Sequence, residues 1–193
     1  MTNIAIFASG SGSNTQKIIE YFCGHPQISV SVVISGNPRA GVKSIAKQNN
    51  IAFKIISKEE FKDPVFVLDL MKHYGVEWIA LAGFLWLLPV FLVKNFPNKI
   101  FNIHPSLLPK YGGKGMYGIK VHEAVAENND LVTGLTIHLV NEKYDEGRIL
   151  FQKQIGITSQ MNPYDIAQAV LNQEHKYYAK TIEKHIISQL RQG

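Results

Sequence analysis

The chain has 193 residues, a length that suits one domain burying about 70% of its unfolded surface without disulfides or metals. Hydrophobic residues make up 46% and charged residues 18%, and no apolar run approaches the roughly 18 residues of a membrane-spanning helix. The net charge of +5 comes from dispersed lysines and arginines, which argues against a nucleic-acid-binding tract and is compatible with an anionic small molecule. We therefore expect a soluble, single-domain protein.

The amino-terminal residues and the cysteine content indicate the compartment. Met1 to Asn3 lead directly into the apolar run Ile4 to Ala8, without the basic segment and cleavage pattern of a secretory signal, so we expect a cytoplasmic protein. The single cysteine, Cys23, excludes an internal disulfide and a thiol-dependent metal cluster. Cys23 falls at an apolar position of an expected helix, which predicts a packing role. The histidines show no zinc-binding spacing, so no metal is expected.

In the first half of the chain, apolar strand-like runs alternate with helical segments. The expected strands are Ile4 to Ala8, Ile28 to Ile34, Ala52 to Ile56, Trp78 to Ala82 and Lys99 to Ile103. The expected helices are Asn14 to Cys23, Gly41 to Asn49, a segment that follows the capping-box spacing Ser57 to Glu60 and runs to about His73, and Pro89 to Asn95. This pattern predicts a doubly wound, mostly parallel α/β sheet with a Rossmann-like N-terminal half.

The second half changes in style. A helix is expected at Lys120 to Glu127, followed by two β-rich runs, Thr133 to Val140 and Arg148 to Ile157, that we expect to pair antiparallel. A long amphipathic helix from Pro163 to Ser188, capped by Asn162, closes the pattern. We find no linker and no repeat. The prediction is one domain over residues 1–193, with a phosphate-binding βα half at 1–100 and a half carrying the catalytic loop at 101–193.

The stretch from Asn102 to Pro109 gives the strongest indication of chemistry. Asn102 and His104 stand two positions apart at the end of an expected strand, so their side chains should project to the same side. One can donate to an oxyanion while the other moves a proton. Pro105 and Pro109 bracket the segment and argue against a helix through it. The alternative is that the motif only opens a turn.

Two further segments carry polar groups. The turn Ser9 to Asn14 joins the first strand to the first helix, where backbone N–H groups and the helix dipole favour a phosphate. It lacks the third glycine of a dinucleotide fingerprint and the Gly-Lys-Ser/Thr of a P-loop, so a turn that binds nothing is the alternative. Asp145 lies between the two late strands. If that edge folds back, its carboxylate would raise the pKa of His104, although an ordinary turn aspartate is the alternative.

Two other histidines are left out of the expected catalytic set. His138 follows Thr136 by two residues on an expected strand and could point toward the same cleft, but a structural histidine is the favoured interpretation. His122 begins a helix after a glycine-rich loop, where a surface position and a ligand contact are both compatible with the sequence.

Four segments in order carry a resemblance: Gly12-Ser13-Asn14, Leu81-Ala82-Gly83-Phe84, Asn102 to Pro109 with Lys110-Tyr111, and Asp145-Glu146-Gly147. Over essentially its whole length, the chain resembles the folate-dependent formyltransferases that act on glycinamide ribonucleotide in purine biosynthesis. The resemblance implies transfer of the formyl group of 10-formyltetrahydrofolate to the amine of that ribonucleotide, without a metal. We further expect a monomer or a weak homodimer that binds neither nucleic acid nor membranes.

The resemblance also implies roles for individual residues. Protonated His104 and the Asn102 amide would stabilise the tetrahedral oxyanion, and His104 or a water held by Asp145 would move the amine proton. The segment that binds the ribose phosphate corresponds to Gly12, Ser13 and Asn14, and a glutamate that contacts the ribonucleotide corresponds to Glu174. The walls of the folate pocket correspond to Leu85, Trp86, Leu87, Leu88, Asn102 and Val140.

The chain departs from the family pattern at two places. The segment Tyr111 to Gly118 is longer and richer in glycine than the corresponding family loop, and we hypothesise that it is a lid over the folate that excludes water. Trp86 stands where many relatives place arginine, and a tryptophan cannot form an ion pair with the glutamate tail of a folate. A second arginine, which some relatives carry after the third strand, has no match near Asp63-Pro64. Lys114 is the available substitute.

Two other activities within the superfamily and one non-enzymatic role are the alternatives. Formyltetrahydrofolate hydrolase and methionyl-tRNA formyltransferase share the Asn, His and Asp arrangement but usually carry an additional domain, which we do not expect here. A phosphate-binding α/β module that uses only the Gly12 turn is the third alternative, and the combined set of Asn102, His104 and Asp145 argues against it.

Overall fold

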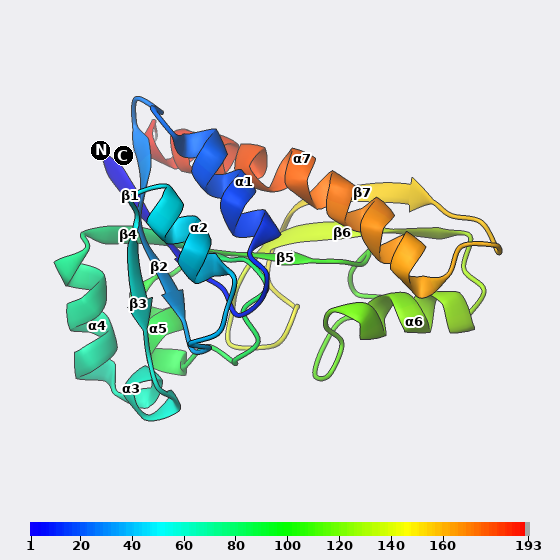
Figure 1. The fold of residues 1–193 in the computed structure, drawn as a ribbon, viewed down its shortest axis with the longest axis horizontal. Coiled ribbons are helices and arrows are strands. Elements are labelled where there is room, and N and C mark those ends of the chain that lie inside the picture. Colours follow the sequence, from blue (N-terminus) through cyan, green and yellow to red (C-terminus); the bar gives the residue numbers. More distant parts are fainter. Residues whose placement is uncertain (192–193) are drawn as a thin grey trace. The chain divides into compact units, whose positions relative to one another are not determined.

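Seven strands form one sheet in the order β3-β2-β1-β4-β5-β6-β7 in the computed structural model, which describes residues 1–191 (Figure 1). The strands are β1 Thr2–Phe7, β2 Ile28–Ser35, β3 Ala52–Ile55, β4 Val76–Leu81, β5 Ile100–His104, β6 Val132–Leu139 and β7 Ile149–Gly156. The helices are α1 Ser13–Phe22, α2 Val42–Gln48, α3 Lys58–Lys62, α4 Pro64–His73, α5 Val90–Asn95, α6 Ile119–Glu127 and α7 Pro163–Leu190. The predicted fold class is confirmed.

The described chain divides into two compact units, one of residues 1–101 and one that begins at Asn102. That the whole chain acts as a single domain stays a prediction. Among the described residues, no helix combines the length and the apolar character that crossing a bilayer would need.

The first unit is a parallel, doubly wound arrangement. β1 pairs in parallel with both β2 and β4, and β2 pairs in parallel with β3. The side chains of Ile4 to Ala8 are fully buried, as expected for a central strand covered on both faces. Strand order runs outward from β1 in both directions, so right-handed crossovers place α1 and α2 on the face opposite α3 and α4. Figure 1 shows α1 and α2 side by side, away from α4.

The helix expected to run to about His73 is divided in two. α3 ends at Lys62 and α4 starts at Pro64, with Asp63 extended between them at φ −83° and ψ 110°. The ring of Pro64 disfavours a helical conformation at the residue before it, which explains the break. Asp63 then caps α4, because its carboxylate accepts from the backbone N–H of Val65 at 2.9 Å. The predicted capping box of Ser57 is present at the start of α3.

The predicted packing role of Cys23 is wrong. α1 ends at Phe22, so Cys23 is the C-cap residue with extended backbone and its side chain is exposed. The buried face of the helix consists of Thr15, Ile18, Ile19 and Phe22, whose spacing is that of one helical stripe.

The second unit pairs a hairpin with a long helix. β6 and β7 are antiparallel, as predicted, with Val132 opposite Gly156 and His138 opposite Ile149. Helix α7 contacts both strands and also α6 (Figure 1). Its inward face repeats every four residues through Ile166, Val170, Glu174, Tyr178, Ile182 and Ile186. The predicted cap is confirmed, since the Asn162 side chain accepts from the backbone N–H groups of the first turn.

Candidate active site

The end of β5 and the connection between β6 and β7 bring three predicted site residues together in the second unit. Nδ1 of His104 lies 3.6 Å from Oδ2 of Asp145. The amide nitrogen of Asn102 lies 3.4 Å from the other carboxylate oxygen of Asp145. Asn102 and His104 therefore project to the same side of β5, and the connection carrying Asp145 folds back onto them. Both geometric predictions are confirmed, whereas the catalytic roles stay predictions.

Three backbone features hold Asp145 in place. Its own backbone is left-handed, at φ 53°, which is uncommon for a residue other than glycine and is tolerated best by Asp and Asn. A side chain at Gly147 would overlap the carbonyl oxygen of Leu139, so only glycine lets the connection lie this close to β6. The backbone N–H of Gly113 donates to Oδ2 of Asp145 at 2.9 Å.

His138, which does not belong to the predicted set, completes the cluster. Its Nδ1 lies 3.0 Å from the carbonyl oxygen of Leu139, which can only accept, so Nδ1 carries the proton when the ring is neutral. Nε2 is then an acceptor, 3.1 Å from the amide nitrogen of Asn102. The same Nε2 lies 3.6 Å from Oδ1 of Asp145. The alternation of Thr136 and His138 along β6 is the sequence signal that pointed to this cleft.

These contacts orient the Asn102 side chain. The carboxylate of Asp145 and the Nε2 lone pair of His138 both face the Asn102 nitrogen, so the NH₂ group points at them and Oδ1 points away. The contact with His138 is the shorter one, and the 3.4 Å contact with Asp145 is the weaker one. Asn102 can therefore accept a hydrogen bond through Oδ1 without any rearrangement. It can also donate from Nδ2 if a ligand atom replaces the 3.4 Å contact with Asp145.

His104 is a buried histidine with a lowered pKa. Burial lowers the pKa below the ordinary 6.5 and outweighs the opposing effects of the Asp145 carboxylate and the Tyr111 carbonyl, which raise it. Asp145 does raise this pKa, as predicted, but the net shift is downward because burial of the imidazole, which the sequence did not show, has the larger effect. Nε2 lies 2.7 Å from the carbonyl oxygen of Tyr111. The neutral ring thus carries its proton on Nε2 and presents the Nδ1 lone pair.

Asp145 remains ionised beside the two histidines. Burial raises the pKa of this carboxyl, but the neighbouring His138 and His104 side chains and the backbone N–H of Gly113 together lower it by more, so the net pKa lies below its ordinary value. A carboxylate held charged in this way stabilises any imidazolium that forms next to it.

A set of hydrogen bonds to β6 and β7 holds the loop that follows His104. The hydroxyl of Thr136 donates to the carbonyl of Ser106 at 2.6 Å and accepts from the backbone N–H of Leu108 at 3.0 Å. The side-chain amide of Gln152 donates both to the Thr136 hydroxyl and to the carbonyl of Leu108. Because these groups lie on paired strands, the loop is fixed to a rigid support.

His122 is buried next to this cluster. The side chain lies on α6 and is 4% exposed, so it is not a surface histidine. Its Nδ1 has no hydrogen-bond partner in the described part of the chain. Burial, with a smaller contribution from the charge of His104, lowers the pKa of His122 to about 4. The ring is therefore neutral at physiological pH.

The predicted phosphate-binding turn lies in the first unit at the start of α1. Gly12 has a left-handed backbone at φ 88° and stands at the N-cap without a side-chain cap. A side chain at Gly12 would collide with Val42 and Ile45 of α2, so glycine is required there. Ser13 and Asn14 form the first turn, where helical N–H groups have no intrahelical acceptor. The turn has the form of an anion site, and phosphate binding stays a prediction.

The remaining predicted ligand residues fall in both units. In the first unit, Leu85 and Leu87 are more than half exposed while Leu88 is buried. Trp86 packs against Phe61, with ring centroids 5.5 Å apart, and its ring covers Gly36. In the second unit, Val140 is half-buried and Glu174 is buried on α7. That these side chains line ligand pockets stays a prediction.

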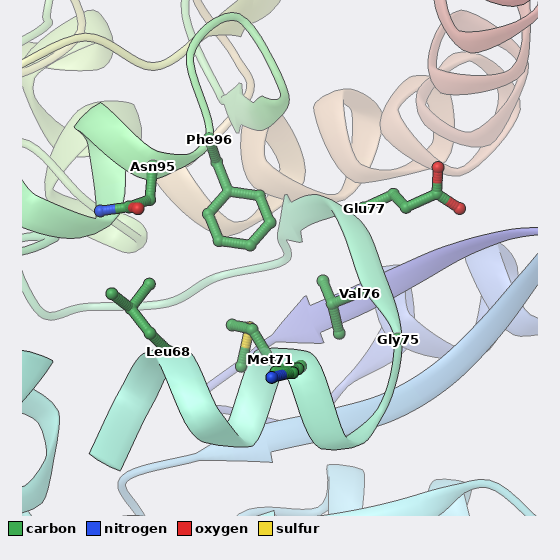
Figure 2. Close-up of a pocket in the computed structure, with 8 residues that line it drawn as sticks. Leu68, Met71, Gly75, Val76, Glu77, Asn95 and Phe96 are labelled. Carbon is green, nitrogen blue, oxygen red and sulfur yellow. The ribbon is translucent and has the colours of Figure 1, made fainter. Parts of the chain in front are cut away.

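The first unit also has a hollow of about 430 Å³ between α4, the start of β4 and the end of α5 (Figure 2). Leu68, Met71, Val76 and Phe96 line it with apolar side chains, and Lys72 and Glu77 lie at its edge. None of the predicted site residues lies in it. Within residues 1–191, no group of three or more His, Cys, Asp or Glu side chains is arranged to hold a metal ion.

A protein-family model matches most of the chain. Residues 2–182 match the family model described as formyl transferase, so the chain belongs to the formyl transferase family. It is 42% identical to the chloroplastic phosphoribosylglycinamide formyltransferase of Arabidopsis thaliana, over 93% of this chain and 63% of the relative. The chain thus spans less than two thirds of the plant relative's length.

Two bacterial proteins match over most of both chains. The phosphoribosylglycinamide formyltransferase of Haemophilus influenzae is 32% identical over 99% of this chain and 90% of the relative. The crystal structure of phosphoribosylglycinamide formyltransferase from Bacillus halodurans matches with a TM-score of 0.86 and 29% identity, covering 96% of this chain and 95% of that one. Membership in the family and the fold therefore rest on sequence and structure alike.

Proposed function

We propose that the protein transfers the formyl group of 10-formyltetrahydrofolate to the amine of N1-(5-phospho-D-ribosyl)glycinamide, giving the N2-formyl product and tetrahydrofolate in de novo purine (IMP) synthesis. The observation that carries the proposal is the cluster in which the Asp145 carboxylate lies 3.4 Å from the Asn102 amide and 3.6 Å from the His104 imidazole, in a chain of the formyl transferase family. The names of the relatives supply the acceptor.

The reaction begins with attack of the glycinamide nitrogen on the formyl carbon. A new C–N bond forms, and the carbonyl oxygen becomes the oxyanion of a tetrahedral intermediate. The Asn102 amide donates to this oxyanion from Nδ2, releasing its long contact with Asp145. Removing one such donor typically costs about 100- to 1,000-fold in turnover.

His104 takes the proton that the attacking amine must lose. The neutral ring is protonated on Nε2, so Nδ1 holds the free lone pair and is the basic atom. The resulting imidazolium has its new N–H beside the Asp145 carboxylate, 3.6 Å away. The lowered pKa of His104 keeps the ring neutral before the reaction and ready to accept a proton.

Collapse of the intermediate completes the transfer. The bond between the formyl carbon and N10 of the folate breaks, and N10 takes up the proton that the imidazolium returns, directly or through a water held by Asp145. Oxidation states do not change, and every proton is accounted for. The step needs no metal, since an amide donor and a histidine supply the stabilisation and the proton.

The remaining predicted residues bind the two substrates in this proposal. The first turn of α1, with Gly12, Ser13 and Asn14, receives the ribose phosphate, and Glu174 contacts the ribonucleotide. The uncapped helix start and its dipole support the first assignment. The folate lies against Leu85 to Leu88, Val140 and Asn102. The exposed side chains of Leu85 and Leu87 support the second assignment, because they offer apolar surface to a ring system.

The proposal includes a monomer or weak homodimer in the cytoplasm that binds neither nucleic acid nor membranes. The dispersed basic residues support the absence of nucleic-acid binding. The plant relative is named a chloroplastic protein, so fractionation of cells expressing the full-length protein is the appropriate test of location. Analytical ultracentrifugation tests the oligomeric state.

The test of the activity is absorbance-monitored deformylation of a 10-formyl folate, with and without glycinamide ribonucleotide. Strict dependence on the ribonucleotide is the expected result. Equal deformylation without it would assign the acceptor to water and make the protein a hydrolase, and turnover only with charged initiator tRNA would make it a tRNA formyltransferase. No turnover in any arm would favour the binding module. Where turnover is found, His104→Ala provides a second test: loss of formyl transfer with ligand affinity nearly intact supports the enzyme, and loss of binding alone favours the module.

A further inference from the structure

The segment Tyr111 to Gly113 touches both members of the proton-transfer pair through backbone atoms. The carbonyl oxygen of Tyr111 lies 2.7 Å from Nε2 of His104. Two residues later, the N–H of Gly113 donates to Asp145 at 2.9 Å. Neither contact uses a side chain, so its geometry depends on what holds this stretch of backbone in position.

The backbone of Tyr111 is in an unusual conformation. Its φ is +57°, in the left-handed region that residues other than glycine, asparagine and aspartate rarely adopt. Gly112 follows in close contact with Leu108, where an added Cβ would collide with the leucine side chain. Glycine would adopt the conformation of residue 111 at less cost, which means that the tyrosine side chain must offset that cost by its own contacts.

Those contacts run to one carboxylate. The hydroxyl of Tyr111 donates to Oδ2 of Asp130 at 2.7 Å. The ammonium of Lys110 contacts both oxygens of the same carboxylate, at 2.7 and 2.6 Å. It also lies 5.0 Å from the centre of the Tyr111 ring, within the range of a cation–π contact. Two successive residues of the loop are thereby attached to Asp130.

Asp130 is itself well anchored. It stands in the turn between α6 and β6, and its backbone N–H donates to the carbonyl of Val125 in α6. Its carboxyl has a lowered pKa, held down first by the hydrogen bond from Lys110 and then by the one from Tyr111. The anchor therefore stays ionised throughout the neutral pH range.

We propose that Lys110, Tyr111 and Asp130 form a latch that positions His104, by holding the Tyr111 carbonyl against Nε2 so that the neutral imidazole is protonated on Nε2 and basic on Nδ1. The proposal rests on the proposed function for its catalytic consequence. The three residues are positioning residues, because none of their side chains contacts the imidazole.

The physical argument is a competition for one proton. A neutral imidazole has a single N–H, and two acceptors face His104: the Tyr111 carbonyl at Nε2 and the Asp145 carboxylate at Nδ1. A carboxylate is the stronger acceptor, so without the carbonyl the proton would move to Nδ1. The ring would then have its lone pair on the wrong nitrogen for the proposed proton transfer. The latch keeps the carbonyl close, at 2.7 Å, while the carboxylate stands at 3.6 Å.

The test compares Tyr111→Phe with Tyr117→Phe by ¹⁵N NMR of the imidazole nitrogens in the ligand-free protein, at a pH above the histidine pKa values. Tyr111→Phe keeps the ring and removes only the hydroxyl that reaches Asp130. Tyr117 lies in the same glycine-rich segment with its side chain 49% exposed, which makes Tyr117→Phe the matched control. The His104 signals are assigned by their loss in His104→Gln.

We expect an Nε2–H ring in the wild type and in Tyr117→Phe, and a mixture enriched in the Nδ1–H form in Tyr111→Phe. Asp130→Asn should move the same signals in the same direction. Turnover of Tyr111→Phe should fall by about 10-fold, less than the roughly 100- to 10,000-fold of a whole general-base contribution because only part of the population changes tautomer, with the KM for the ribonucleotide changed less than about twofold.

Unchanged His104 signals in both Tyr111→Phe and Asp130→Asn would overturn the latch, as would an Nδ1–H ring in the wild type. If a variant loses its folded near-ultraviolet spectrum, the other variant decides. Because the NMR measurement uses no substrate, it is independent of the proposed function. If the tautomer changes in the variants but the protein transfers no formyl group, the latch stands and the proposed function is wrong. If the protein transfers the formyl group but the tautomer does not change, the proposed function stands and the latch is wrong.

Discussion

Gly147 leaves no room for a side chain beside the carbonyl oxygen of Leu139. The close approach matters because the connection from β6 to β7 carries Asp145 to the cluster at the end of β5. We expect Gly147→Ala to push this connection outward, destabilise the protein by about 1 to 3 kcal/mol and lower turnover at least about 10-fold. Gly156→Ala at the far end of β7 is the control, since an added Cβ there meets nothing within 4 Å. Equal activity of the two variants would contradict the prediction.

Asn102 is oriented by His138, and this yields a second prediction. His138→Leu removes the acceptor that lies 3.1 Å from the Asn102 amide and leaves the half-buried NH₂ group only its long, 3.4 Å contact with Asp145. We expect turnover to fall by about 10- to 100-fold, while the KM for either substrate changes little, because the amide would donate poorly to the oxyanion. Steady-state kinetics measures turnover and KM, and melting temperatures show whether the variant is folded. A change in KM alone would assign His138 to substrate binding instead.

The pH dependence of turnover follows from the lowered pKa of His104. The neutral ring is the active base, so activity should be full above the ordinary histidine pKa of 6.5 and should fall as pH drops through the lowered value. Asp145→Asn removes the carboxylate that raises this pKa. In that variant, turnover should fall by about 100-fold or more, and the residual acid limb should move to lower pH. An acid limb that moves to higher pH would contradict this account.

His122 should make the fold sensitive to acid. Its pKa is about 4 in the folded state and 6.5 in the unfolded one, so the unfolded state binds the proton first as pH falls. The stability that neutral His122 contributes is fully present above pH 6.5 and is lost progressively as the pH falls toward 4. In His122→Leu, we expect the loss between neutral and mildly acidic pH to be smaller by on the order of 1 kcal/mol, allowing for solvent screening. Urea unfolding at the two pH values measures the difference, and an identical loss in both proteins would count against it.

The hypothesis of a lid concerns the segment Tyr111 to Gly118, which contains three glycines with positive φ at 113, 115 and 118. We expect amide hydrogen exchange in this segment to slow by about 10-fold or more when a non-reactive folate analogue saturates the protein, because a closed loop shields its N–H groups. Exchange in α4, which contains no predicted ligand residue, serves as the internal control. Unchanged hydrogen exchange in the segment would contradict the lid hypothesis.

Local patterns in the sequence were sufficient for most of the fold and for part of the site. The run Ile4 to Ala8 is buried throughout, and the alternation of runs predicted the parallel first unit and the antiparallel hairpin. The two-residue spacing of Asn102 and His104 placed both on one side of β5, because the strand period is two. The division at Asp63 was also a local matter, since Pro64 determines it, yet the helical periodicity on both sides concealed it.

Interactions between distant segments decided the rest, because they depend on which groups meet and how much water they exclude. Asp145 reaches His104 only through the turn that Gly147 permits, and His138 joins them only because β6 lies in the same unit. The sign of the His104 pKa shift depends on burial, which outweighs a carboxylate that the sequence could name. Cys23 became exposed because α1 ends one residue early. The sequence by itself thus determined the order of strands and helices along the chain and the placement of Asn102 and His104 on one side of β5, because short-range periodicity sets both. The tertiary structure alone decided which groups contact these two residues and how His104 is protonated, because both depend on desolvation and on contacts between residues far apart in the chain.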